Sequence, residues 1–380
     1  MTLSSIAVIL IFFLVTSQIL ILRLPPIATQ LFRPLMIAMI IIRMARNGHV
    51  RSAPRTLAAV AALHAAMVLL YHPESWNYDI VSSGIAVSLY FLMFSFAIGA
   101  AWTKQELKYI ILASFLGCFA CAVAILVSNN PTDFHAATDG HLELLGVSVN
   151  RNKNAYQYAF GSVLGCIYLL KGKRNKVIIF LITAVIAYAL LYSQCRGAFL
   201  ATVTSISALL IGKVFEIRKK SGNNKAVLFF LFLVMLYLGA FYLLKNSELS
   251  RLVDGDSTSG RDEGIAAAWK IFLNSDWFGK IFGNGFGYEH QQTGEIGAHL
   301  VYVSFLVSMG MIGSGLTALL FLKTFQRTFG SGAISLILVA FMKTFFESAD
   351  YNVFIPLILG VVLCNYSRLN RRSYYELFGK

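Results

Sequence analysis

Residues 109–127 read YIILASFLGCFACAVAILV, an apolar run without a charged side chain. Its length is close to the roughly 20 residues that a helix needs to cross the hydrocarbon core of a bilayer. A continuous helix satisfies its own backbone hydrogen bonds in lipid, so a run of this kind is expected to be helical. Similar runs of about 16 to 22 residues recur along the whole chain, each closed by a short polar break. The sequence therefore predicts an all-α, polytopic membrane protein.

The composition agrees with this fold class. Of the 380 residues, 57% are hydrophobic and 13% are charged, whereas soluble domains carry about 25% charged residues. The first run, Ser4 to Leu22, has neither a basic start nor a small-residue cleavage site, so we interpret it as a retained helix and not as a signal peptide. The five cysteines lie in or beside apolar runs, which indicates packing residues and predicts no disulfide framework or metal site.

We predict about twelve spans in a single integral membrane domain that covers residues 1–380. The predicted spans are residues 4–22, 27–42, 57–71, 80–101, 109–127, 154–170, 176–192, 197–212, 226–244, 299–322, 332–346 and 351–366. Two outer segments, 128–153 and 245–298, are longer than a simple connection requires. The second is a periplasmic loop segment between the ninth and tenth spans, for which we expect short amphipathic helices.

The distribution of Lys and Arg predicts the orientation. The loop after the second span carries Arg43, Arg46, Arg51 and Arg55, and the later even-numbered loops are also basic, whereas the odd-numbered loops are acidic, mixed or short. The positive-inside rule then places the even loops and both termini in the cytoplasm. Lipid headgroups account for the net charge of +14, so we expect membrane lipids and no nucleic acid as partners.

Four residues on the predicted outer face are candidates for chemistry. Arg151 stands in NRNKNAYQYAF, Arg196 in SQCRGAFLA, Arg261 in GRDEGIAAAWKIFLNSDWFG and His299 in GAHLVYVSFLVSMGMIG. A guanidinium donates two hydrogen bonds at once to a phosphate, and a histidine can accept a proton near neutral pH. The arginines therefore suit a lipid pyrophosphate, and His299 suits the removal of a proton from a hydroxyl group.

Structural explanations for the same residues stay open. Arg196 would also suit a side chain that reaches to lipid headgroups, and a histidine at a helix start often has a structural role. Three further histidines on the outer loops compete with His299 for a functional role; they are His135, His141 and His290.

Other motifs favour simpler interpretations. Asp254 and Asp256 have a spacing that some glycosyltransferases use for a metal, but in their Gly/Ser-rich surroundings they indicate a turn. GNGFG, at 283–287, lacks the Lys-Ser/Thr of a nucleotide-binding loop and is interpreted as a flexible turn. Ionisable residues are nearly absent from the span interiors, with His64 and, near an outer end, Lys343 as exceptions. This scarcity argues against a proton pump or an ion-coupled transporter.

Four of these strings, in this order, resemble the bacterial O-antigen ligases and the O-antigen or exopolysaccharide polymerases. They are the NRNKNA helix entry, the CRGAFLA turn, GR followed by a Trp-containing helix and a Gly-rich turn, and the His-initiated span that ends in Gly-Met-Ile-Gly, over about residues 148–316. The resemblance implies an inner-membrane, metal-independent, inverting glycosyltransferase without a cofactor. Its donor would be a glycan on undecaprenyl pyrophosphate.

Carried over by position, the resemblance implies that Arg196 and Arg261 hold the pyrophosphate, with Arg151 as a further cation, and that His299 is the general base. This sequence departs from the family at Leu300, where an Asn often follows the histidine.

A polymerase passes the glycan to another lipid-linked unit, and a ligase passes it to the lipid A core. The modest outer segment 245–298 favours the polymerase, for which a chain-length regulator is a candidate partner, and the ligase stays open. A flippase for lipid-linked oligosaccharide is the third alternative.

Overall fold

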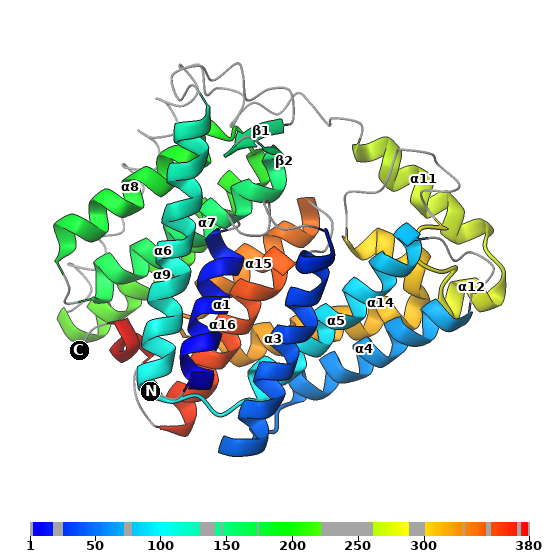
Figure 1. Ribbon diagram of the computed structural model, residues 1–380, viewed down its shortest axis with the longest axis horizontal. Coiled ribbons are helices and arrows are strands. Elements are labelled where there is room, and N and C mark those ends of the chain that lie inside the picture. Colours follow the sequence, from blue (N-terminus) through cyan, green and yellow to red (C-terminus); the bar gives the residue numbers. More distant parts are fainter. Residues whose placement is uncertain are drawn as a thin grey trace.

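A computed structural model describes residues 3–17, 26–71, 78–129, 141–145, 147–172, 175–221, 261–288, 301–329, 331–346, 351–370 and 374–378. Within these residues the chain is a bundle of helices, with one short β-hairpin and the helix α11 on the upper side of the molecule as drawn in Figure 1. The helices are α1 (Leu3–Ser17), α3 (Pro26–Asn47), α4 (Ala53–Tyr71), α5 (Tyr78–Gly99), α6 (Lys104–Ser128), α7 (Arg151–Lys171), α8 (Lys176–Tyr192), α9 (Arg196–Ser221), α11 (Arg261–Asn274), α12 (Trp277–Phe282), α14 (Val301–Thr328), α15 (Ile334–Phe346), α16 (Tyr351–Leu369) and the 3-10 helix η4 (Tyr374–Phe378); the strands are β1 (His141–Leu144) and β2 (Val147–Asn150).

The all-α class and the membrane character are confirmed. Every predicted span except the ninth coincides with a helix, and the ninth, 226–244, lies outside the described residues. Among the described residues, four helices are long and apolar enough to cross a membrane: Ala53–Tyr71, Lys104–Ser128, Arg196–Val214 and Tyr302–Thr328. Shorter apolar helices accompany them. That twelve helices cross the membrane, and in which orientation, stays a prediction.

Small residues let the helices approach closely. A Cβ atom at Gly117 of α6 would lie 2.0 Å from the hydroxyl of Thr16 on α1, and one at Gly165 of α7 would lie 2.2 Å from the hydroxyl of Thr183 on α8. The side-chain amide of Gln157 on α7 donates to the Thr16 carbonyl at 3.0 Å. Close contact through small residues and polar bonds between helices is the usual way in which membrane helices associate, because lipid removes the hydrophobic drive between them.

A buried ion pair joins three helices at one end of the bundle. Arg43, 2% exposed, pairs with the carboxylate of Glu106 at the start of α6, and the Ser5 hydroxyl of α1 donates to the same carboxylate. The guanidinium also lies 4.7 Å from the ring centroid of Trp102. The prediction that Arg43 lies in a loop is wrong, because α3 continues to Asn47.

We call this end of the bundle the Glu106 end. It holds the start of α1 and also η4, since Lys104 Nζ lies 3.9 Å from the Glu376 carboxylate and the Phe378 ring packs edge-on against Tyr168 near the end of α7. The first and last described helices therefore lie at the same end. This arrangement agrees with a chain that crosses the membrane an even number of times. That the Glu106 end lies in the cytoplasm stays a prediction.

Helix α14 is broken at Gly310, whose φ of 65° and ψ of −170° interrupt the helical hydrogen bonds. The Nε2 atom of His64 on α4 lies 2.9 Å from the Met309 carbonyl beside the break. The GNGFG turn supplies further donors: the backbone N–H of Asn284 donates to the Val307 carbonyl at 2.9 Å, and the backbone N–H of Gly285 donates to the Ser308 carbonyl at 3.2 Å. The sequence predicts a flexible turn at 283–287, whereas the structure has a turn packed against a broken helix.

Candidate functional site

The β1–β2 hairpin leads the chain directly into Arg151. Its strands pair antiparallel, and the Leu145 N–H at its turn donates to the Ser128 hydroxyl at the end of α6 at 2.9 Å. The hairpin also buries the side chains of Leu144 and Val149. Arg151, the first residue of α7, is therefore held at a fixed place and is 6% exposed. We call this end of the bundle, where α6 ends and α7 begins, the Arg151 end.

A second buried cation lies at this end on another helix. Lys343, in the last turn of α15, is 1% exposed, and its Nζ lies 5.3 Å from the centroid of the Tyr156 ring near the start of α7. The next residue, Thr344, donates its hydroxyl to the phenol oxygen of Tyr302 in the first turn of α14 at 3.2 Å. The end of α15 therefore meets the starts of both α7 and α14.

Arg196 begins α9 after a buried turn. Gln194, with a φ of 49°, donates its N–H to the Leu191 carbonyl at 3.0 Å, and the Ser193 hydroxyl donates to the Leu190 carbonyl at 2.6 Å. Ser193 and Gln194 are buried, and Arg196 is partly exposed. Helix α8 runs antiparallel to α7, because Gly161 and Gly165 of α7 approach Ile186 and Thr183 of α8 in turn. The turn after α8 therefore brings the start of α9 to the Arg151 end.

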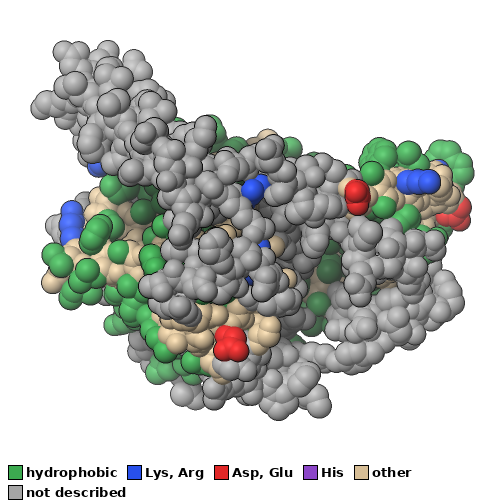
Figure 2. All heavy atoms as spheres, turned by 90° about the horizontal axis from the view of Figure 1, so that it is seen from above, with side chains coloured by type: hydrophobic (Ala, Val, Ile, Leu, Met, Phe, Trp, Pro, Cys, Tyr) green, Lys and Arg blue, Asp and Glu red, His purple; other side chains and the backbone are tan. Residues whose placement is uncertain are grey.

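This end of the bundle is therefore rich in positive charge. Arg151, Arg196 and Lys343 lie there, and the starts of α7, α9 and α14 direct the positive ends of their helix dipoles to the same side. Figure 2, seen from this side, shows small Lys or Arg surfaces near the middle of the face, and others at its left and right edges. A cation that is shielded from water attracts an anion more strongly than an exposed one. The arrangement suits an anionic, phosphate-bearing ligand.

The remaining predicted site residues are described in part or not at all. Arg261 is the first residue of α11, and this helix packs its Ala268 and Phe272 against Val307 of α14. The side chain of Arg261 lies outside the described residues, as does all of His299, which precedes Tyr302 by three positions in the sequence.

The competing residues have the following places. His141 opens β1 opposite Asn150, and His135, His290, Asp254 and Asp256 lie outside the described residues. Within the described part of the chain, no three His, Cys, Asp or Glu residues gather in a way that could hold a metal ion.

The sequence predicts that Lys343 is an ionisable residue near an outer helix end and gives it no role at the site. Nothing in the local sequence indicates that it lies beside Tyr156, which precedes it by almost 190 positions along the chain. The signal that could have identified it is a lysine within the apolar run ISLILVAFMKTFF at 334–346. A charge in such a run is costly and usually functional.

No protein-family model and no curated protein matches this sequence.

Proposed function

We propose that the protein is a membrane glycosyltransferase that polymerises oligosaccharide repeat units carried on undecaprenyl pyrophosphate, at the periplasmic face of the bacterial inner membrane. The observation that carries the proposal is the burial of Arg151 and Lys343, 6% and 1% exposed, where the starts of α7, α9 and α14 meet the end of α15. Cations and helix starts of this kind suit the two negatively charged phosphates of a lipid pyrophosphate.

The proposed reaction is a single displacement. His299 accepts the proton of the acceptor hydroxyl, and the hydroxyl oxygen forms a bond to the anomeric carbon of the donor glycan. The bond between that carbon and the pyrophosphate oxygen breaks, and the electron pair leaves with the lipid pyrophosphate. Arg196, Arg261 and Arg151 stabilise the charge that develops on the leaving group. The anomeric centre is inverted, and the lipid pyrophosphate itself supplies the activation.

In vitro transfer with purified protein and a lipid-linked donor tests this assignment. His299→Ala is expected to abolish transfer and to leave donor binding intact, with His290→Ala as the matched control. Arg196→Lys is expected to impair transfer, because lysine keeps the charge and loses the two-pronged hydrogen bond. Full activity of both Arg196→Ala and Arg261→Ala would indicate that these arginines contact lipid headgroups and do not bind the donor.

The same assay includes a chelator. Added EDTA is expected to leave transfer unchanged. Strong inhibition by EDTA, together with loss of activity in Asp256→Ala and full activity in His299→Ala, would replace the proposal by a metal-dependent transferase that uses Asp254 and Asp256.

Gel analysis of surface polysaccharide in a deletion strain separates the polymerase from its alternatives. Lipid A core that carries single repeat units indicates the polymerase, whereas long chains that are not attached to the core indicate the ligase. Transbilayer movement of a lipid-linked oligosaccharide by purified protein in vesicles, without transfer, would indicate a flippase.

A further inference from the structure

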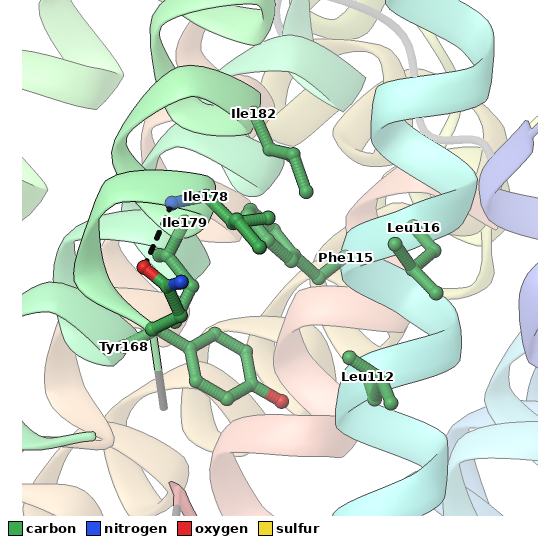
Figure 3. A pocket seen from close by; sticks show the side chains of 8 residues that line it. Leu112, Phe115, Leu116, Tyr168, Ile178, Ile179 and Ile182 are labelled. Atoms are coloured by element: carbon green, nitrogen blue, oxygen red, sulfur yellow. Dashed lines mark hydrogen bonds between the residues drawn. The ribbon is translucent and has the colours of Figure 1, made fainter. Parts of the chain in front are cut away.

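An apolar cavity opens between α6 and α8, far along the helices from the Arg151 end. It has a volume of about 460 Å³, within the range of ligand-binding pockets. Its walls are Leu112, Phe115 and Leu116 of α6, Ile178, Ile179 and Ile182 of α8, and Tyr168 of α7, with Asn175 before α8. In Figure 3 the leucines of α6 face the isoleucines of α8 across the open space, and the Tyr168 ring lies at one side.

The cavity lies in the half of the bundle near the Glu106 end. Leu112 is two turns from the start of α6, and Ile179 is one turn from the start of α8. Tyr168 packs against Phe378 of η4, which belongs to that end. Leu116 and Ile178 are 37% and 55% exposed, so the cavity is open on the side of the bundle. In a protein that crosses a membrane, such an opening faces hydrocarbon chains and not water.

Positive charge lies beside the cavity on the side of the Glu106 end. Lys108 is one helical turn before Leu112 and therefore on the same face of α6. Lys176 is exposed at the first position of α8, next to Asn175. The Oδ1 atom of Asn175 accepts from the N–H groups of Val177 and Ile178 at 3.1 and 3.5 Å. The positive end of the α8 dipole therefore lies beside Asn175 and Lys176.

We propose that this cavity, the α6–α8 groove, binds one anionic glycerophospholipid. An acyl chain of the lipid packs between the leucines of α6 and the isoleucines of α8. The phosphate lies at Lys108 and Lys176 beside the start of α8, and the side-chain amide of Asn175 donates a hydrogen bond to it. An acyl chain alone would need only the apolar walls; the two lysines at one end of the groove select a negatively charged headgroup. The groove is separate from the proposed transferase site and does not depend on it.

Native mass spectrometry of the full-length protein tests the proposal, with phosphatidylglycerol and phosphatidylethanolamine of identical acyl chains added in equal amounts. The wild-type protein is expected to retain one phosphatidylglycerol molecule in preference to phosphatidylethanolamine. Ile182→Trp fills the groove and is expected to remove the bound lipid, and Leu112→Trp does the same from the opposite wall. Phe180→Trp is the matched control, because Phe180 lies on the same helix, is 60% exposed and does not line the cavity.

The double variant Lys108→Ala/Lys176→Ala tests the role of the two positive charges. It is expected to lower the preference for phosphatidylglycerol roughly tenfold or more while an acyl chain can still enter. Equal retention of the two lipids by the wild-type protein, or unchanged lipid retention in both tryptophan variants, would overturn the proposal. A retained lipid with the mass of an isoprenoid phosphate would also overturn it, because the groove would then bind the tail of a lipid-linked glycan and not a glycerophospholipid.

Discussion

Lys343 lies in an environment that its neighbours in the sequence do not indicate. It is 1% exposed and lies beside the Tyr156 ring, at the end of the bundle that also holds Arg151. Lys343→Met keeps most of the side-chain volume and removes the charge. We expect it to weaken binding of undecaprenyl pyrophosphate by about 10- to 100-fold, since a hydrogen bond to a charged group contributes roughly 1.5–3 kcal/mol.

Lipid-binding measurements on the purified variant check this expectation. Lys323→Met, an exposed position on α14, is the control. Unchanged affinity in Lys343→Met, accompanied by a lower thermal midpoint, would assign Lys343 a structural role alone.

Arg43 and Glu106 form a buried ion pair, and removal of either partner leaves the other charge buried and unpaired. Their side chains are 1% and 7% exposed. Glu106→Ala would leave a buried guanidinium without its carboxylate, and we expect a loss of about 3–5 kcal/mol in the free energy of unfolding. Glu376→Ala breaks the partly exposed pair with Lys104 and should cost at most about 1 kcal/mol.

Thermal unfolding in detergent compares these two variants. The double variant Arg43→Met/Glu106→Leu should be more stable than Glu106→Ala, because neither charge is then buried alone. A Glu106→Ala protein as stable as Glu376→Ala would contradict the structural role of the pair.

At the scale of single elements, the break in α14 depends on Gly310. Its φ of 65° is strained for any other residue, and a Cβ atom there would lie 2.5 Å from the Ile281 carbonyl oxygen. We expect Gly310→Ala to lower the thermal midpoint clearly and to expose the GNGFG turn to protease. Gly315→Ala, five positions later in the same helix and with no atom within 4 Å of the new methyl group, should leave stability unchanged or raise it slightly. Equal thermal midpoints for the two variants would show that the turn does not depend on this close approach.

At the scale of the whole molecule, the Lys and Arg bias of the loops predicts that the Glu106 end of the bundle faces the cytoplasm. Helix η4 lies at the Glu106 end, and α9 runs from the Arg151 end to Ser221, so reporters after α9 and after η4 should give the same result. Fusions at Asn223 and Lys380 should report the cytoplasm, and a fusion at Thr258 should report the periplasm, as the Lys and Arg bias of the loops predicts. A cytoplasmic signal at Thr258 would place Arg261 in the wrong compartment for the proposed donor and would remove the mechanism.

The sequence by itself determined the fold class and the positions of most helices. Apolar runs such as 109–127 have no stable alternative to a helix in lipid, because every backbone polar group must be paired within the segment. The NRNKNA string predicts a helix entry at Arg151, and α7 begins there. Arg196 is predicted in the turn before a span that starts at residue 197, whereas in the structure it is the first residue of α9. Local pattern was sufficient for these features, since each depends on residues that are close together in the chain.

Only the tertiary structure decided which residues meet. The pairing of Arg43 with Glu106, of Lys343 with the Tyr156 ring and of His64 with the Met309 carbonyl joins helices that are far apart in sequence. Hydrophobic periodicity contains no information on such partners, because neighbouring helices are selected by close packing of small residues and by individual polar contacts. The packed GNGFG turn shows the same limit: its glycines indicate a turn, but the broken helix on which it rests lies in another part of the chain.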